Sequence, residues 1–157
     1  MGIVKKDTNK KGYIDMATHA SRDTSTGIDF EKRITIKKDG ICLTKNALYK
    51  YLEKNKIDWT TIISRKLLPD EAYYNPVTKE LFIYEKKYQQ CEGSADEKPQ
   101  TCGFKIWQYK KLGRAMGAKK VTYTYLLSSW FAQEKYRDML EYIRNEVPDC
   151  DYIIVGD

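Results

Sequence analysis

Charged side chains directly follow an apolar run in the segment LLPDEAYYNPVTKELFIYEKKYQQ, residues 67–90. Residues 81–84 (LFIY) are typical of a strand that enters a core, yet Glu85 and Lys87 come soon after without any turn signal. Asp70 stands near the start of the same segment. Because an unpaired buried charge costs free energy, these side chains need a charged partner, solvent or a ligand. Carboxylates hold divalent cations, and a cation together with a lysine stabilises the negative charge of a reacting phosphoryl group.

The turn in this segment predicts which residues face one another. Asn75 followed by Pro76 is a turn signal between two apolar runs, and it predicts a β-hairpin with a four-residue loop. In that register Asn75 pairs with Glu80, and Asp70 faces Glu85 with Cβ atoms roughly 5 Å apart. Two carboxylates at that separation repel each other unless a cation binds between them. Since magnesium binds one or two carboxylates plus water and substrate phosphates, Asp70 and Glu85 are the candidate metal ligands.

Strand alternation places further polar groups beside these carboxylates. Glu85, Lys87 and Gln89 are spaced by two, so they point to one side of the strand. Lys87 is expected roughly 7 Å along the strand from Glu85, where its ammonium group can orient a water molecule or counter the charge of a phosphoryl group. Lys86 points to the opposite face, and we expect it to be solvated or to contact DNA.

These residues resemble a known catalytic pattern. Pro69-Asp70, followed by Glu85-Lys86-Lys87 on the second strand of the hairpin, is similar to the motif of the PD-(D/E)XK nuclease superfamily, which includes many restriction endonucleases. The resemblance implies that Asp70 and Glu85 hold Mg²⁺, for which Mn²⁺ substitutes. It also implies that Lys87 serves the water molecule that attacks phosphorus.

Two more residues fit places that members of this superfamily use. Glu31, in the sequence GIDFEKR, is the candidate for an acidic residue that often joins the site from the preceding helix. Gln89 fits the place of a glutamine that lies beyond the catalytic lysine. The resemblance covers residues 26–127. It implies a restriction-endonuclease-like core, in which a helix precedes the hairpin and helices and strands then alternate.

The remaining sequence predicts one mixed domain, residues 25–157, after a polar N-terminal arm or peripheral hairpin, residues 1–24. Helices are expected from Ser25 or Thr26 to about Lys38, from Thr44 through Leu52, from Ser94 or Pro99 to Gly113 or Gly117, and from Ser129 through Ile143. Strands besides the hairpin are expected at residues 119–127 and 152–155. The fold class is therefore α/β (α+β), with a central mixed sheet flanked by helices. Tyr109 and Trp107 are expected in its core.

The composition favours a nucleic acid as the partner. The net charge is +6, many lysines stand in pairs, and 13 tyrosines and three tryptophans are distributed among them. Cationic grooves with aromatic side chains are a footprint of nucleic-acid binding. A soluble domain with a lysine-rich surface has the same composition, so composition does not separate these two interpretations.

The few cysteines and the single histidine limit the kinds of metal site and catalytic residue that this chain can form. The four cysteines are far apart and form no CxxC pair, and His19 is the only histidine. Both facts disfavour a zinc site and a histidine-based catalytic triad, so the chemistry is expected to depend on carboxylates and lysines. We expect reduced, mostly buried thiols. The chain has no apolar run of about 18 residues and no signal-peptide pattern, which predicts a cytoplasmic protein without a membrane partner.

Together these features predict a magnesium-dependent endonuclease of the restriction or mobile-element type, which hydrolyses phosphodiester bonds in DNA. A two-fold assembly would place two sites on antiparallel strands, so a homodimer or a higher even oligomer is expected. Two alternatives remain open. One is a structure-specific junction or repair nuclease on the same scaffold, and the other is a non-catalytic nucleic-acid-binding protein.

Overall fold

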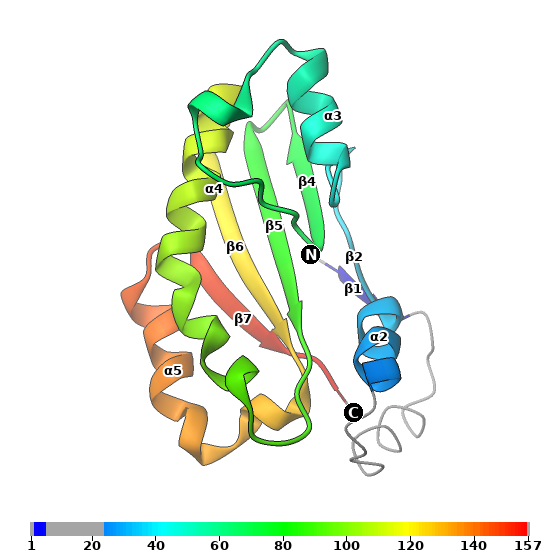
Figure 1. Ribbon diagram of the computed structural model, residues 1–157, viewed down its shortest axis with the longest axis vertical. Helices are drawn as coiled ribbons and strands as arrows, with labels where there is room; N and C mark the ends of the chain where they lie inside the picture. Colours follow the sequence, from blue (N-terminus) through cyan, green and yellow to red (C-terminus); the bar gives the residue numbers. More distant parts are fainter. Residues whose placement is uncertain (1, 6–23, 157) are drawn as a thin grey trace.

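A mixed five-stranded sheet forms the centre of the molecule in the computed structural model, which describes residues 2–5 and 24–156 (Figure 1). The strand order is β3-β4-β5-β6-β7, with β3, β4 and β5 antiparallel and β5, β6 and β7 parallel. The strands of this sheet are β3 (Ile41–Cys42), β4 (Glu71–Asn75), β5 (Glu80–Lys87), β6 (Lys120–Leu127) and β7 (Cys150–Ile154). The expected central mixed sheet is confirmed.

Helices cover both faces of this sheet, as predicted (Figure 1). The helices are α2 (Thr24–Arg33), α3 (Ala47–Lys54), α4 (Cys102–Met116) and α5 (Arg137–Glu141). Helices α3, α4 and α5 contribute to one core with β4, β5 and β6. On the opposite face, α2 and strand β2 (Ile34–Lys37) form a smaller core with β5 and β6. The two cores divide β5 between them, because successive side chains of a strand point to opposite faces.

The hairpin of β4 and β5 has the predicted register. Asn75 pairs with Glu80, and Ala72 pairs with Ile83. The Asn75 side chain closes the loop by accepting hydrogen bonds from the backbone N–H groups of Val77 (2.9 Å) and Thr78 (3.2 Å). An Asn side chain that bonds its own turn in this way explains why the Asn-Pro signal predicted the loop correctly.

The first predicted helix ends earlier than expected. Helix α2 stops at Arg33, and Ile34–Lys37 form strand β2, which pairs antiparallel with β1 (Gly2–Lys5). The prediction of helix to about Lys38 was wrong, because Ile34 and Ile36 alternate with more exposed neighbours and are buried as in a strand. Residues 6–23, where most of the predicted arm or hairpin falls, lie outside the described part of the chain.

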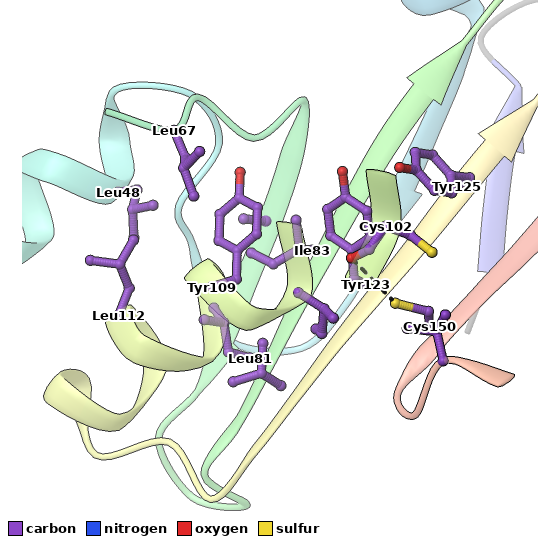
Figure 2. Close-up of a cluster of buried hydrophobic side chains, with 14 of the residues drawn as sticks. Leu48, Leu67, Leu81, Ile83, Cys102, Tyr109, Leu112, Tyr123, Tyr125 and Cys150 are labelled. Carbon is purple, nitrogen blue, oxygen red and sulfur yellow. Dashed lines mark hydrogen bonds between the residues drawn. The ribbon is translucent and has the colours of Figure 1, made fainter. Parts of the chain in front are cut away.

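The larger core holds the cluster drawn in Figure 2. Leu48 of α3 and Leu112 of α4 pack there with Leu81 and Ile83 of β5. Helix α4 approaches the sheet closely at Gly113, where an added Cβ would lie 2.6 Å from a methyl group of Val121. Helix α4 then ends at Gly117, whose φ of +94° is left-handed, as is usual for a glycine that caps a helix.

Several further expectations differ in detail from the structure. Tyr109 is buried as expected, whereas Trp107 is 55% exposed on the outer side of α4.

The predicted helix after Ser129 is divided into short pieces, namely η3 (Ser129–Ala132), η4 (Glu134–Tyr136), α5 and the π-helical η5 (Tyr142–Glu146). Two of the four free cysteines, Cys102 and Cys150, are buried, and the Cys150 thiol donates to the Cys102 carbonyl at 3.8 Å (Figure 2). Within the described residues, no helix has the length and hydropathy needed to cross a membrane.

Candidate active site

The hairpin brings the two predicted metal ligands together. Asp70 immediately precedes β4, and Glu85 lies on β5, one position beyond the last recorded pair of the hairpin, Glu71 and Tyr84. The Asp70 side chain is anchored because one carboxylate oxygen accepts a hydrogen bond from the backbone N–H of Lys86 at 2.8 Å. The carboxyl groups of Asp70 and Glu85 are themselves hydrogen-bonded. The sequence therefore predicted this contact correctly.

This contact makes the two carboxyl groups chemically different. Burial, the charge of Asp70 and the hydrogen bond to it together raise the pKa of Glu85 to about 8, although the charges of Lys87 and Lys45 act to lower it. Burial also acts to raise the pKa of Asp70, but hydrogen bonds from Lys45, the Lys86 N–H and Glu85 outweigh it and lower that pKa. At neutral pH, without a bound cation, Glu85 is thus mostly protonated and Asp70 is ionised. The pair shares one proton.

Lys45 is a member of the site that the sequence did not reveal. Its ammonium group forms an ion pair with Asp70, and it lies in a loop before α3. The backbone of Lys45 has a left-handed φ of +53°, and its N–H donates to the Pro69 carbonyl at 2.9 Å. Burial lowers the pKa of Lys45, but the attraction of Asp70, Glu85 and Glu31 raises it overall. A cation therefore already occupies one side of the carboxyl pair.

Glu85 and Lys87 open into a cleft of about 410 Å³ between the hairpin, α4 and β6. Three further lysines line this cleft: Lys66, Lys98 and Lys105. None of the three belongs to the hairpin, so only the folded chain gathers them around Glu85. A polyanion entering the cleft would meet four ammonium groups beside a carboxyl pair.

Three tyrosines form the inner wall of the same cleft: Tyr109, Tyr123 and Tyr125. Tyr125 is the parallel-strand partner of Glu85, and the hydroxyl groups of Tyr109 and Tyr123 point to the same side of the sheet (Figure 2). The Tyr109 and Tyr123 rings stack with centroids 5.8 Å apart. Burial, followed by the nearby charge of Glu85, raises the pKa of both Tyr109 and Tyr123. Both therefore remain neutral phenols. The Tyr123 hydroxyl donates to Tyr125, and the Tyr109 hydroxyl can donate a hydrogen bond to an anionic oxygen.

Sequence reasoning could have found two of these tyrosines. Tyr123 and Tyr125 are spaced by two on a predicted strand, so one face of that strand carries both rings. The parallel register places Tyr123 beside Ile83 and Tyr125 beside Glu85. The other lysines of the cleft, Lys66, Lys98 and Lys105, give no comparable signal, because they come from loops and helices whose positions depend on the tertiary fold.

Lys86 does not have the environment that was predicted for it. Its side chain is 9% exposed, so it is neither solvated nor available to DNA, and that expectation was wrong. The ammonium group donates to the Glu31 backbone carbonyl at 2.8 Å and lies 3.5 Å from the Glu71 carboxylate. Glu71 also accepts a hydrogen bond from the Ile36 N–H at 3.0 Å. Lys86 is buried because α2 and β2 cover this face of the hairpin.

The structure places the two remaining candidates, Glu31 and Gln89, in different environments. The Glu31 side chain is exposed on α2, although its charge contributes to raising the pKa of Lys45. Gln89 follows the end of β5, where strand alternation no longer sets its direction. Its side-chain amide donates to the Cys91 carbonyl, and it lines a different, smaller cavity beside Ser128 and Trp130. Asp70, Glu85 and Lys87 are thus brought together, Glu31 stays at the rim, and Gln89 stays apart.

The donor atoms of the carboxyl pair suit a hard divalent cation. Within residues 2–5 and 24–156, no group of three or more Asp, Glu, His or Cys side chains could hold a metal ion. Magnesium does not require such a group, because one or two carboxylates plus water and substrate phosphates complete its octahedron. Asp70 and Glu85 supply two adjacent carboxyl groups, and the Lys45 ammonium group already places one positive charge beside Asp70. The pair therefore fits Mg²⁺ or Mn²⁺ better than it fits zinc.

The chain matches no protein-family model, no curated protein and no solved structure. Interpretation of the site accordingly depends on its own geometry.

Proposed function

We propose that this protein is a magnesium-dependent endonuclease that hydrolyses phosphodiester bonds in DNA, of the restriction or mobile-element type. The observation that carries the proposal is the carboxyl pair of Asp70 and Glu85, of which Glu85 lines a cleft together with Lys87 and three other lysines. The resemblance of these residues to the PD-(D/E)XK pattern agrees with this assignment. A purely structural carboxyl pair would not need a cationic cleft beside it.

Each part of the site has a role in this proposal. Asp70 and Glu85 would hold the cation, which when bound lowers the pKa of water and stabilises charge on the phosphoryl group. Lys87 orients the attacking water or neutralises the developing charge, as its place in the cleft allows. Lys66, Lys98 and Lys105 bind the phosphates on either side of the reacting group. The neutral hydroxyl group of Tyr109 donates a hydrogen bond to a phosphate oxygen, whereas the Tyr123 hydroxyl donates to Tyr125.

Cleavage of a supercoiled plasmid with and without Mg²⁺ or Mn²⁺ tests the proposal. Asp70→Asn, Glu85→Gln and Lys87→Ala are each expected to slow metal-dependent cleavage by about 100-fold or more, since each removes a cation ligand or a charge that stabilises the transition state. Lys119→Ala is the matched control, because Lys119 is an exposed lysine at the opposite end of the sheet, beside the β4–β5 turn. Unchanged cleavage in all three site variants would refute the proposal.

Two other functions use the same cleft. A structure-specific junction or repair nuclease would cut branched DNA in preference to a plain duplex. A non-catalytic nucleic-acid-binding protein would bind DNA in Ca²⁺ but leave a plasmid intact in Mg²⁺. The raised pKa of Glu85 favours an enzyme over a binding module, because a binding surface for phosphates has no use for a buried acid at its centre.

The proposal extends to assembly and location. A homodimer, or a higher even oligomer, would place two sites on the two strands of a duplex. Sedimentation with and without DNA measures this directly, and a monomer in both conditions would favour a nickase. All four cysteines are free thiols, which agrees with activity in a reducing compartment such as the cytoplasm.

A further inference from the structure

A second cleft lies between α3 and the short helix η1 (Trp59–Thr61), outside the candidate active site. Its volume is about 690 Å³, which is within the range of sites that accept a small organic group. Tyr49 and Trp59 supply aromatic surface, and Lys50, Lys56 and Lys66 supply positive charge. The proposed cleavage reaction does not use any residue of this cleft except Lys66.

The aromatic wall of this cleft is fixed in place. The Tyr49 hydroxyl donates to the Leu67 carbonyl at 2.5 Å and accepts from the Leu67 N–H at 2.6 Å. The Trp59 ring meets Tyr49 edge-on, with centroids 5.5 Å apart. Asp58 caps the turn that carries Trp59 by accepting from the Thr60 N–H at 3.0 Å. A preformed aromatic surface loses little conformational entropy when a planar group stacks on it.

Lys66 connects the two clefts. It lines the active-site cleft together with Glu85 and Lys87, and it also lines the cleft that contains Trp59. Its ammonium group lies 4.6 Å from the centroid of the Tyr49 ring. A phosphate bound by Lys66 would therefore lie at the boundary between the reacting phosphodiester and the aromatic wall.

The charges of the second cleft favour the base of a nucleotide over a second phosphate. Besides its lysines the cleft contains two carboxylates, Glu53 and Asp58. These disfavour a second phosphate inside the cleft, but they can accept hydrogen bonds from the amino groups of a base. Bases of any sequence stack on aromatic side chains, whereas a base inside a duplex cannot reach such a surface.

We propose that this cleft binds one unpaired nucleotide of the DNA substrate next to the cut, with its base against Trp59 and its phosphate at Lys66. This inference depends on the proposed nuclease function and specifies its substrate class, namely DNA that contains or exposes an unpaired base. A continuous duplex would leave the cleft empty or would have to expel a base from the helix.

The test compares two fluorescent DNA substrates bound in Ca²⁺: a continuous duplex and the same duplex with a short single-stranded gap. The parent protein is expected to bind the gapped DNA at least about fivefold more tightly, since stacking of one base on an aromatic side chain is worth about 1–3 kcal/mol. Trp59→Leu should lose this preference, and Lys66→Ala should weaken binding of both substrates. Trp107→Leu is the matched control, because Trp107 is exposed on α4 and does not line either cleft.

A second measurement uses the parent protein alone, so it does not depend on the folding of any variant. A photoreactive 5-iodouracil placed at the unpaired position should crosslink to a peptide that contains Trp59, as identified by mass spectrometry. Crosslinks only to other peptides, or none, would overturn the inference. Equal binding of both substrates by the parent would overturn it while leaving the nuclease proposal intact. Failure to bind any DNA would overturn both.

Discussion

The two faces of the β4–β5 hairpin carry the same residue types in different arrangements. On the face covered by α2 and β2, Glu71 and Lys86 are 8% and 9% exposed and lie 3.5 Å apart. On the other face, Asp70 and Glu85 place two acids side by side. The first arrangement pairs opposite charges and gives each a backbone partner, from Ile36 and Glu31. The second arrangement places like charges together at the edge of a cleft.

This difference separates a structural ion pair from a candidate site. Glu71 and Lys86 hold β2 and α2 against the sheet, and their charges are balanced by each other and by hydrogen bonds to the backbone. Glu85 is mostly protonated at neutral pH because burial and Asp70 raise its pKa to about 8, and Lys45 forms an ion pair with Asp70. A pair of acids that must bind a proton or a cation is poised to bind a metal ion. The arrangement of the charges, rather than their number, thus points to function.

The largest effect that would test this comparison is on folding. Lys86→Ala should lower the free energy of unfolding by roughly 3–5 kcal/mol, because it leaves Glu71 as an uncompensated buried charge. Lys87→Ala should cost less than about 1 kcal/mol, since Lys87 opens into the cleft. Urea unfolding of both variants measures the difference. Equal losses, or a larger loss for Lys87→Ala, would contradict the assignment of structural and functional faces.

The sequence was sufficient for the hairpin but not for its surroundings. The Asn-Pro turn fixed the register, and strand alternation then placed Asp70, Glu85 and Lys87 correctly. Alternation also placed Lys86 on the opposite face, but it could not show that β2 and α2 cover that face. The strand at Ile34–Lys37 continues directly from a helix without a turn signal, so its period of two was missed.

The composition of the cleft could not be predicted from the sequence, because tertiary packing brings its residues together. Apart from Lys87, its lysines come from three separate elements: the loop before β4, the helix η2 (Ser94–Thr101) and α4. Each is a single exposed or half-buried lysine in its local sequence, and no spacing rule relates one to another. Lys45 is similar, since its contact with Asp70 depends on a left-handed loop backbone that lysine rarely adopts. Tertiary packing determines these contacts, and local sequence patterns do not predict them.

A smaller expected effect is the pH dependence of the free energy of unfolding, to which Glu85 should contribute. Without metal, folding raises the pKa of Glu85 from an ordinary 4.5 to about 8, so the folded protein holds a proton that the unfolded chain releases. Its contribution to stability is therefore complete below about pH 4.5 and is lost as the pH rises to about 8. Between pH 6 and pH 8 the loss should be about 2 kcal/mol.

Urea unfolding in a chelator at these two pH values measures that loss. Glu85→Gln is expected to remove the dependence, because an amide does not titrate, and the difference between parent and variant isolates the contribution of Glu85. Added Ca²⁺ should reverse the trend in the parent, since a cation binds only after Glu85 has lost its proton. An identical pH dependence in parent and Glu85→Gln would mean that the acid is already ionised and that the carboxyl pair shares no proton.

The smallest expected effect is on the affinity for a cation and concerns Lys45. Lys45 pairs with Asp70 as Lys86 pairs with Glu71 on the other face. If its ammonium group occupies part of the place of a metal ion, removing it should strengthen cation binding. Lys45→Ala is expected to raise the affinity for Ca²⁺ by about fivefold, or about 1 kcal/mol, a small value because the Lys45 side chain is 50% exposed and well screened. Isothermal titration calorimetry measures this, and Lys54→Ala on the exposed side of α3 is the control. Weaker binding in Lys45→Ala would show instead that Lys45 positions Asp70 for the metal, and the carboxyl pair would then depend on an opposite charge as Glu71 does.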